Sequence, residues 1–317
     1  MKKQIALILL FAAAAAAAGP VPVIYDTDMG NDIDDALALA MLHALEARGE
    51  IRLRAVTVTK SNVWAARYVS AVNRFYGRGD LPVGLVRGGV TPDEGNYVRR
   101  ALEQGGWPHD LEFPEAVGLL RRVLSEETDG SIVIVQVGFS TNLARLIDSP
   151  GGRELAARKV RLLVMMAGDF AGGGPEYNVK EDVPSARKLA SEWPGPIVWS
   201  GFEVGRAIRF PARSIEHDFA WAGRHPVVDG YKLYMKFPYD RETWDLTAVL
   251  YAARPEDGYF TVSGPGWVRI DERGMTRFEP DPAGRHRYLR VNDIQCARVL
   301  EAMIWLASQP VRGTMRH

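Results

Sequence analysis

Five aspartates lie within ten residues of one another, and they follow a short apolar run at 21–25: Asp26, Asp28, Asp32, Asp34 and Asp35. Carboxylates at this density repel one another, so a cation is needed if several of them converge. Calcium takes six to eight oxygen ligands in proteins, often from carboxylates and backbone carbonyls. The spacing therefore predicts a site for a hard divalent cation, placed between a buried strand and the helix that follows it.

Helix capping and an EF-hand loop could also place acids in this segment. Acids near a helix N-terminus interact favourably with the helix dipole, which could account for Asp34 or Asp35 but not for the whole group. An EF-hand loop starting at Asp26 requires Gly at its sixth position and Glu at its twelfth. This chain has Asn31 and Leu37 there, so an EF-hand is excluded.

A phosphatase of the haloacid dehalogenase type remains an alternative. In that case Asp26 would be the nucleophile and Asp28 the acid, immediately after the first strand. That class expects Thr or Val two residues after the second aspartate, where this chain has Gly30. The alternative predicts dependence on magnesium and loss of activity when Asp26 is changed.

The elements around the acidic segment alternate between strand and helix. Buried, non-alternating apolar runs are typical of parallel strands that are covered on both faces. Strands are predicted at 51–59, 81–86, 132–137, 160–166 and 197–199, and helices at 33–45, 64–75, 116–124 and 142–147. This order predicts an α/β fold with a doubly wound, mostly parallel central sheet, which binds ligands at the carboxyl ends of its strands.

The remaining segments have a different character. Residues 88–114 and 217–243 are rich in Gly, Pro, charge or aromatic side chains, and long loops are predicted there. Residues 259–288 alternate and contain Gly-Pro-Gly and Asp-Pro turns, which indicates a small C-terminal β-hairpin region. An amphipathic helix is predicted at 290–306.

With four further stretches, the acidic segment resembles the inosine/uridine-preferring nucleoside hydrolases, in a secreted subgroup with a longer motif. The signature is Asp-x-Asp-x-Gly-x-Asp-Asp-Ala, here with two extra residues. The additional stretches occur in the family's order at 59–63, 79–83, 138–144 and 176–178. Together they extend from 21 to 255. The resemblance implies the family's fold and hydrolysis of the bond between a base and ribose.

The resemblance also implies a calcium site and a catalytic base. The implied calcium ligands are Asp28, Asp35, the backbone carbonyl of Thr141, and Asp245 in the stretch 244–248. A water polarised by the cation would be the nucleophile, and Asp28 would act as its general base. The ribose would gain oxocarbenium character as the bond weakens, as in glycoside hydrolysis.

The implied substrate contacts come from several segments. Asp34, Asn62 and Asn178 would bind ribose hydroxyls, Glu176 the 5′-hydroxyl, and Trp244 the base. Three simpler interpretations stay open: an ordinary loop at 176–178, a polar turn at Asn62, and core packing for Trp244.

Two positions depart from the family. Phe170 stands where the family has an Asn that contacts the 5′-hydroxyl. Trp244 stands where purine/pyrimidine enzymes have the His implicated in protonating the leaving base. The identity of the base and the 5′ substituent of the sugar are therefore not readable from the sequence.

The composition and charge of the chain limit the kinds of partner that it is expected to bind. The 39 basic and 39 acidic side chains balance, without a basic block, so nothing indicates binding to nucleic acid. The single cysteine, Cys296, excludes an intrachain disulfide. The expected partner is a small-molecule nucleoside or riboside, and the family's dimers and tetramers leave a homo-oligomer open.

The first residues are typical of a processing segment. Lys2 and Lys3 precede an apolar run at 5–18 that ends in alanines. This pattern predicts a signal peptide at 1–18, with a retained membrane anchor as the alternative. The expected product is one exported catalytic domain at 19–317, periplasmic or secreted, with no membrane contact after cleavage.

The sequence thus predicts an N-ribosyl hydrolase that contains calcium and scavenges nucleosides. A non-catalytic protein that binds a riboside through the same calcium is the main alternative, because the residues near the leaving group depart from the family.

Overall fold

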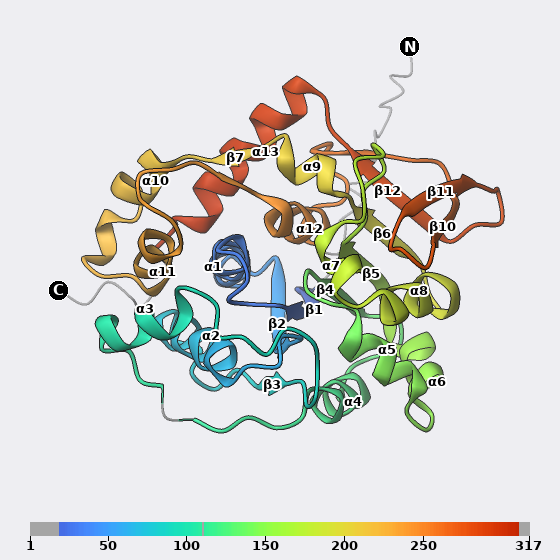
Figure 1. Cartoon of the computed structure of the whole chain (residues 1–317), viewed down its shortest axis with the longest axis horizontal. Helices are drawn as coiled ribbons and strands as arrows, with labels where there is room; N and C mark the ends of the chain where they lie inside the picture. Colours follow the sequence, from blue (N-terminus) through green and yellow to red (C-terminus); the bar gives the residue numbers. More distant parts are fainter. Residues whose placement is uncertain (1–18, 110, 311–317) are drawn as a thin grey trace, which may run out of the picture.

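The computed structural model describes residues 19–109 and 111–310 of the chain, and ten strands form one sheet at its centre (Figure 1). The order along the sheet is β11-β10-β12-β6-β5-β4-β1-β2-β3, with β9 paired to β12. The predicted signal peptide at 1–18 lies outside the described residues. In the described part of the chain, no helix is long and apolar enough to cross a bilayer.

The middle of the sheet is entirely parallel. It consists of β1 (Val21–Thr27), β2 (Ile51–Val58), β3 (Val83–Leu85), β4 (Ile132–Gln136), β5 (Val160–Met166) and β6 (Ile197–Ser200). The chain adds β2 and β3 on one side of β1 and then crosses to add β4 on the other side. Ligands bind in α/β sheets at such a switch point. The predicted doubly wound, mostly parallel sheet is confirmed.

Helices cover both faces of this sheet. One face packs on α1 (Asp34–Ala47), α2 (Val63–Phe75), α12 (Trp244–Ala253) and α13 (Asp293–Ala307). The other face packs on α4 (Ala116–Glu126), α5 (Thr141–Asp148), α6 (Gly152–Lys159) and α8 (Val183–Glu192). Side chains of a strand alternate between faces, so Tyr25 belongs to the first core and Ile24 to the second.

The C-terminal hairpin is present, but it extends the main sheet. Strands β10 (Gly266–Ile270) and β11 (Thr276–Pro280) are antiparallel. Strand β12 (His286–Arg290) runs parallel to β6 and so joins this hairpin to the central sheet, while β9 (Thr261–Val262) pairs with β12. Helix α13 begins at a capping box formed by Asn292 and Gln295.

The two long loops expected at 88–114 and 217–243 were predicted wrongly in part. The first contains α3 (Val98–Gly105), whose Val98, Ala101 and Leu102 are buried at helical spacing. The second contains η1 (Ala220–Ala222), α11 (Pro226–Tyr234) and β8 (Arg241–Glu242), which pairs with β7 (Arg209–Phe210). Tertiary packing of short apolar stripes outweighs the Gly and charge content of these segments. The short helices α7 (Tyr177–Glu181), α9 (Phe202–Arg206) and α10 (Ala212–His217) complete the chain.

Candidate active site

A cavity of about 710 Å³ opens at the carboxyl ends of the central strands, next to the switch point at β1. Eight acidic residues from four separate segments line it: Asp28, Asp32, Asp34, Asp35, Asp93, Glu94, Glu176 and Asp245. Of the described residues that line it, Arg241 alone is basic. An excess of negative charge in a concave, half-enclosed site indicates that a cation belongs there.

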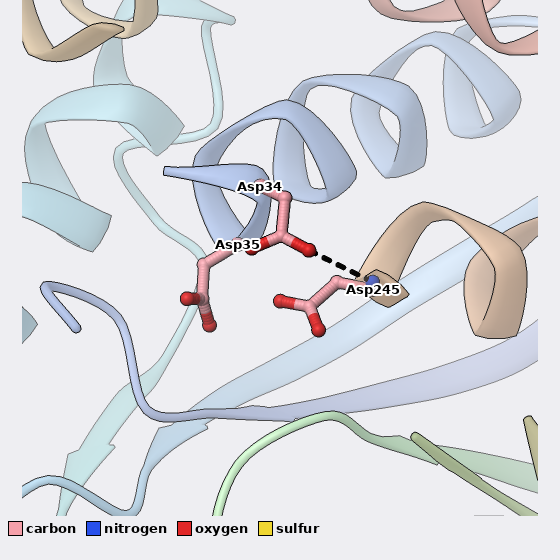
Figure 2. A group of neighbouring side chains, drawn as sticks. All are labelled: Asp34, Asp35 and Asp245. Atoms are coloured by element: carbon pink, nitrogen blue, oxygen red, sulfur yellow. Dashed lines mark hydrogen bonds between the residues drawn. The ribbon is translucent and has the colours of Figure 1, made fainter. Parts of the chain in front are cut away.

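Three of these carboxylates converge at one end of the cavity, and we call them the carboxylate cluster. Asp34 and Asp35 lie in the first turn of α1 and Asp245 in the first turn of α12 (Figure 2). An oxygen from each lies within 4.8 Å of the others, and all three side chains are buried. Burial, followed by the charges of neighbouring carboxylates, raises the pKa of each well above its usual value.

The surroundings of the cluster compensate only part of this charge. The backbone N–H of Asp245 donates to Oδ2 of Asp34 at 3.1 Å, which joins α1 to α12 (Figure 2). Thr27 donates its hydroxyl to Oδ1 of Asp35. Oδ2 of Asp245 is buried and has no donor among the described residues. Buried acceptors without a partner are rare, and three hard oxygen donors around one point fit a divalent cation such as calcium.

Asp28 lines the same cavity but lies outside the carboxylate cluster. Burial raises its pKa to about 6, against the opposing effects of a hydrogen bond from Asn31 and the charge of Lys60. The amide of Asn31 donates to Oδ2 of Asp28 at 2.7 Å. Of the predicted carboxylate ligands, the structure thus brings Asp35 and Asp245 together, and it adds Asp34, which was predicted to bind ribose.

The predicted carbonyl ligand, Thr141, is not on the cavity. Thr141 begins α5, and its hydroxyl bonds to Asp182. The residue of this segment that lines the cavity is Val137, immediately after β4 ends, and its carbonyl accepts from the amide of the lining residue Asn178 at 2.6 Å. Asn142, the residue after Thr141, is also absent from the cavity lining, and its amide donates to Asp26 at 2.8 Å. The end of a buried strand was the signal that could have identified Val137.

Asn62 was predicted to bind ribose, but it also lies outside the cavity lining. Its Oδ1 caps α2 by accepting from the N–H of Trp64 at 2.9 Å, and its amide donates to the carbonyl of Pro92 at 2.9 Å. The polar-turn interpretation is the one that these contacts support. The amide next to Asp28 comes instead from Asn31, within the extended acidic motif.

Glu176 and Asn178 are on the cavity, as predicted. Glu176 caps α7 and accepts from the backbone N–H groups of Gly168, Asn178 and Val179. Burial raises its pKa to about 7. The amide of Asn178 donates to the carbonyls of Val137 and Met166, at 2.6 and 3.1 Å. Its Oδ1, which no described donor reaches, therefore remains free to accept from a ligand hydroxyl.

Another part of the cavity lining consists of Phe202, Tyr234, Arg241 and Trp244, which we call the aromatic end. The indole of Trp244 stacks on Phe202 at 5.3 Å and donates to the carbonyl of Phe202 at 2.9 Å. The guanidinium of Arg241 lies 5.1 Å from the centre of the same indole and forms an ion pair with Asp32. The indole of Trp244 is therefore in contact with two protein groups, Phe202 and Arg241. The sequence did not predict Arg241 as a site residue, because it lies in no recognisable motif.

Comparison with known proteins matches these features to one family. The model of the inosine-uridine preferring nucleoside hydrolases matches residues 23–301. The chain belongs to this family. This confirms the resemblance inferred from the five motifs.

Curated nucleoside hydrolases match over part of their length. The chain is 27% identical over 212 residues to a pyrimidine-specific ribonucleoside hydrolase RihA of Shewanella sp. strain MR-4, which covers 62% of this chain and 63% of that protein. The enzyme of the same description from strain MR-7 is 28% identical over 216 residues, with the same coverage. The match thus spans less than two thirds of these relatives.

Solved nucleoside hydrolases share the fold over nearly the whole chain. A plant nucleoside hydrolase superposes with a TM-score of 0.72 at 21% identity, covering 92% of this chain and all of its own. A purine-preferring ribonucleoside hydrolase from Gardnerella vaginalis gives 0.72 at 18% identity, covering 90% and 98%. At these identities the superposition shows the fold alone.

In this member of the family the first aspartate of the motif has a structural role. Asp26 is fully buried, and its Oδ1 accepts from the hydroxyl of Thr57 at 2.5 Å and from the amide of Asn142 at 2.8 Å. It is not among the residues that line the cavity. A phosphatase would need this carboxylate exposed to its substrate as the nucleophile, so the geometry does not support that alternative.

The departure from the family at Phe170 also has a structural cause. Phe170 stacks on Tyr288 of β12 at 4.9 Å and does not line the cavity. The strands that extend the sheet beyond β6 hold this side chain away from the cavity.

Proposed function

We propose that the protein hydrolyses the N-glycosidic bond of a ribonucleoside or related riboside, with calcium bound, and releases free base and ribose. The observation that carries the proposal is the buried carboxylate cluster in a cavity whose lining also has the aromatic end. A sugar with hydroxyl groups suits the first end, and a planar base suits the second.

Calcium is the cation that the donor set favours. Carboxylate and carbonyl oxygens from Asp34, Asp35, Asp245 and Val137 are hard ligands from different elements, and calcium accepts such irregular sets more readily than magnesium. When bound, the cation would supply positive charge to the ribose hydroxyls and to the attacking water. It would also relieve the repulsion among the three carboxylates.

Asp28 is proposed as the general base. Its carboxylate lines the cavity, and a pKa of about 6 leaves it largely ionised at neutral pH and still able to accept a proton. The nearby carboxylates favour the positive charge that develops on ribose as the bond to the base breaks. Asn178, through Oδ1, is placed to accept from a ribose hydroxyl.

The leaving base would meet the aromatic end. No described histidine lines the cavity, so the charge on the departing base is balanced by Arg241 in this proposal. The named relatives differ in preference, one being pyrimidine-specific and another purine-preferring. The base preferred by this protein is therefore a matter for measurement.

The decisive experiment measures reducing sugar released from a panel of ribonucleosides, with calcium and with chelator. Calcium-dependent release is expected, and Asp28→Asn should abolish turnover while calcium and ribose still bind. Absence of release by protein that binds calcium and a riboside would instead establish the non-catalytic binding protein. Release that persists in chelator would contradict the role of the cation.

We also propose that the enzyme acts after export, on the basis of the apolar segment at 5–18. N-terminal sequencing of the protein recovered from the periplasm or medium should show a start near Gly19. Recovery of the full-length chain in the membrane fraction would support the anchor alternative.

A further inference from the structure

Next to Asp28 lies a lysine that the proposed reaction does not use. Lys60 lies two residues after the end of β2, and its side chain is 0% exposed. Burying an ammonium group away from water is unfavourable unless it is paired and hydrogen-bonded. Lys60 nevertheless has one charged partner only among the described residues, Asp93, whose own side chain is 69% exposed. A structural ion pair does not account well for this lysine.

The second partner of Lys60 is the amide of Asn31. Its ammonium group donates to Oδ1 of Asn31 at 2.5 Å, while Nδ2 of Asn31 donates to Oδ2 of Asp28 at 2.7 Å. A lysine can only donate, so it selects one of the two orientations of the amide. With Oδ1 facing Lys60, the N–H groups must face Asp28. The reverse orientation would place the amide oxygen against the carboxylate.

The backbone holds this arrangement in place. Asp28 to Asn31 form a turn in which the N–H of Asn31 donates to the carbonyl of Asp28 at 3.3 Å. Gly30, third in the turn, has φ of +105°, which side chains other than glycine rarely adopt. The segment that carries Asp93 packs on this turn so closely that a side chain at Gly95 would overlap the carbonyl of Gly30. Lys60 is thus enclosed between the turn and the cavity rim.

We propose that Lys60 is a positioning residue: it orients the amide of Asn31, which in turn holds the carboxylate of Asp28 toward the reacting water. This inference rests on the proposed function for its kinetic part. Neither Lys60 nor Asn31 belongs to the carboxylate cluster, so their effect should fall on turnover and leave the binding of the cation unchanged.

The chain offers a matched control for removing a buried lysine. Lys159, in α6, is 9% exposed, donates to the carbonyl of Glu127 at 2.7 Å, and pairs with Asp129, whose side chain is 62% exposed. It has the same kinds of partner as Lys60, but its partners do not line the cavity. Lys159→Met therefore reports the structural cost of such a change without any effect on Asp28.

The kinetic test compares Lys60→Met, Asn31→Ala, the double variant and Lys159→Met, at saturating calcium. Losing a hydrogen bond to a charged group should lower kcat for Lys60→Met and Asn31→Ala by about 10- to 100-fold. KM and the calcium Kd should stay within about threefold. The double variant should be no slower than the slower single variant, since coupled residues are not additive. Lys159→Met should keep wild-type kcat.

A spectroscopic test does not depend on turnover. In the calcium-loaded protein with ¹⁵N-labelled asparagine, the side-chain amide of Asn31 should give a signal protected from solvent exchange, identified by its loss in Asn31→Ala. Lys60→Met should shift this signal and raise its exchange rate at least about tenfold, whereas Lys159→Met should leave it unchanged.

The outcomes separate the two proposals. An Asn31 signal unchanged by Lys60→Met, additive kinetic losses, or a calcium Kd that weakens as much as kcat would overturn the role of Lys60. If the wild type hydrolyses no riboside, the proposed function fails, and the exchange measurement alone decides whether Lys60 orients Asn31.

Discussion

The two ends of the cavity are built in opposite ways. At the acidic end, Asp34 and Asp35 come from one helix start directly after the central strand, and one further segment contributes Asp245. At the aromatic end, Trp244 begins α12 next to Asp245, but Phe202, Tyr234 and Arg241 come from α9, α11 and β8, which are short elements beyond the parallel strands. The acidic end is therefore fixed by the fold itself, and the aromatic end by packing among the connections.

This difference indicates which part of the site can vary without disturbing the sheet. Moving Asp34 or Asp35 would disturb α1 and the central strand, so the cation site is tied to the stability of the sheet. The aromatic end depends on stacking, such as Phe202 on Trp244, and on the ion pair between Arg241 and Asp32. These contacts can be exchanged without altering the sheet. We therefore expect the chemistry to reside at the acidic end and the choice of base at the aromatic end.

The largest effect should follow from Asp245→Asn. Asp245 has a buried oxygen without a donor, so the change removes charge where a cation is expected and adds an amide with no partner. Breaking a buried charge interaction costs roughly 3–5 kcal/mol, so kcat/KM should fall by about a thousandfold and calcium affinity should fall with it, as measured by kinetics and calorimetry. Asp129→Asn, on the surface, is the control. Normal calcium affinity in Asp245→Asn would place the cation elsewhere.

Removal of calcium by a chelator should have the next largest effect, which is a loss of folding stability that depends on pH. Burial raises the pKa of Asp26 and Glu176 to about 7 and that of Asp28 to about 6. Carboxyl groups with a raised pKa in the folded state favour folding at low pH, and this contribution is lost as pH rises from about 4 to 7. Metal-free protein should therefore become less stable over that range.

The carboxylate cluster adds to this loss, because burial and neighbouring carboxylates raise the pKa of Asp34, Asp35 and Asp245 well above the usual value. Calcium should remove the part of the loss that comes from the cluster, because it stabilises the ionised carboxylates. At a hundredfold excess over Kd a ligand adds about 2.7 kcal/mol, which corresponds to roughly 5 °C or more in Tm. Scanning calorimetry with calcium and with chelator should show a gap that widens between pH 5 and 7.5. A gap that is constant or narrows with pH would contradict a cation held by these carboxylates.

The same contrast explains what the sequence could predict. The buried apolar runs of the central strands and the acids that follow β1 are local patterns, so the parallel sheet and Asp28, Asp34 and Asp35 could be predicted from the sequence. Asp245 could be placed only through the resemblance to the family. Its meeting with α1 depends on a contact between residues more than two hundred positions apart.

The differences between the predicted site residues and the lining of the cavity have equally specific causes. Thr and Asn can either contact a ligand or form hydrogen bonds within the fold, and the sequence does not distinguish the two roles. In the structure Thr141, at the start of α5, bonds to Asp182, and Asn62 caps α2. Val137 was missed because its contribution is a backbone carbonyl, which any residue can supply. Arg241 was missed because its position over Trp244 arises from the pairing of β7 with β8.

The smallest expected effect is at the aromatic end. It tests most directly whether the chemistry resides at the acidic end and the choice of base at the aromatic end. Arg241→Met keeps the length of the side chain but removes the cation that would balance the charge of a departing base. Because Asp32 already pairs with Arg241, a loss of roughly tenfold in kcat/KM for ribonucleosides is expected. Nitrophenyl riboside, whose leaving group departs as a stable anion, should be hydrolysed at nearly the wild-type rate.

The matched control is Arg206→Met, because Arg206 is an exposed arginine over Phe202 outside the cavity. If Arg241→Met slowed both kinds of substrate equally and weakened calcium binding, the two ends would act as one unit, and base preference could not be changed without affecting the chemistry.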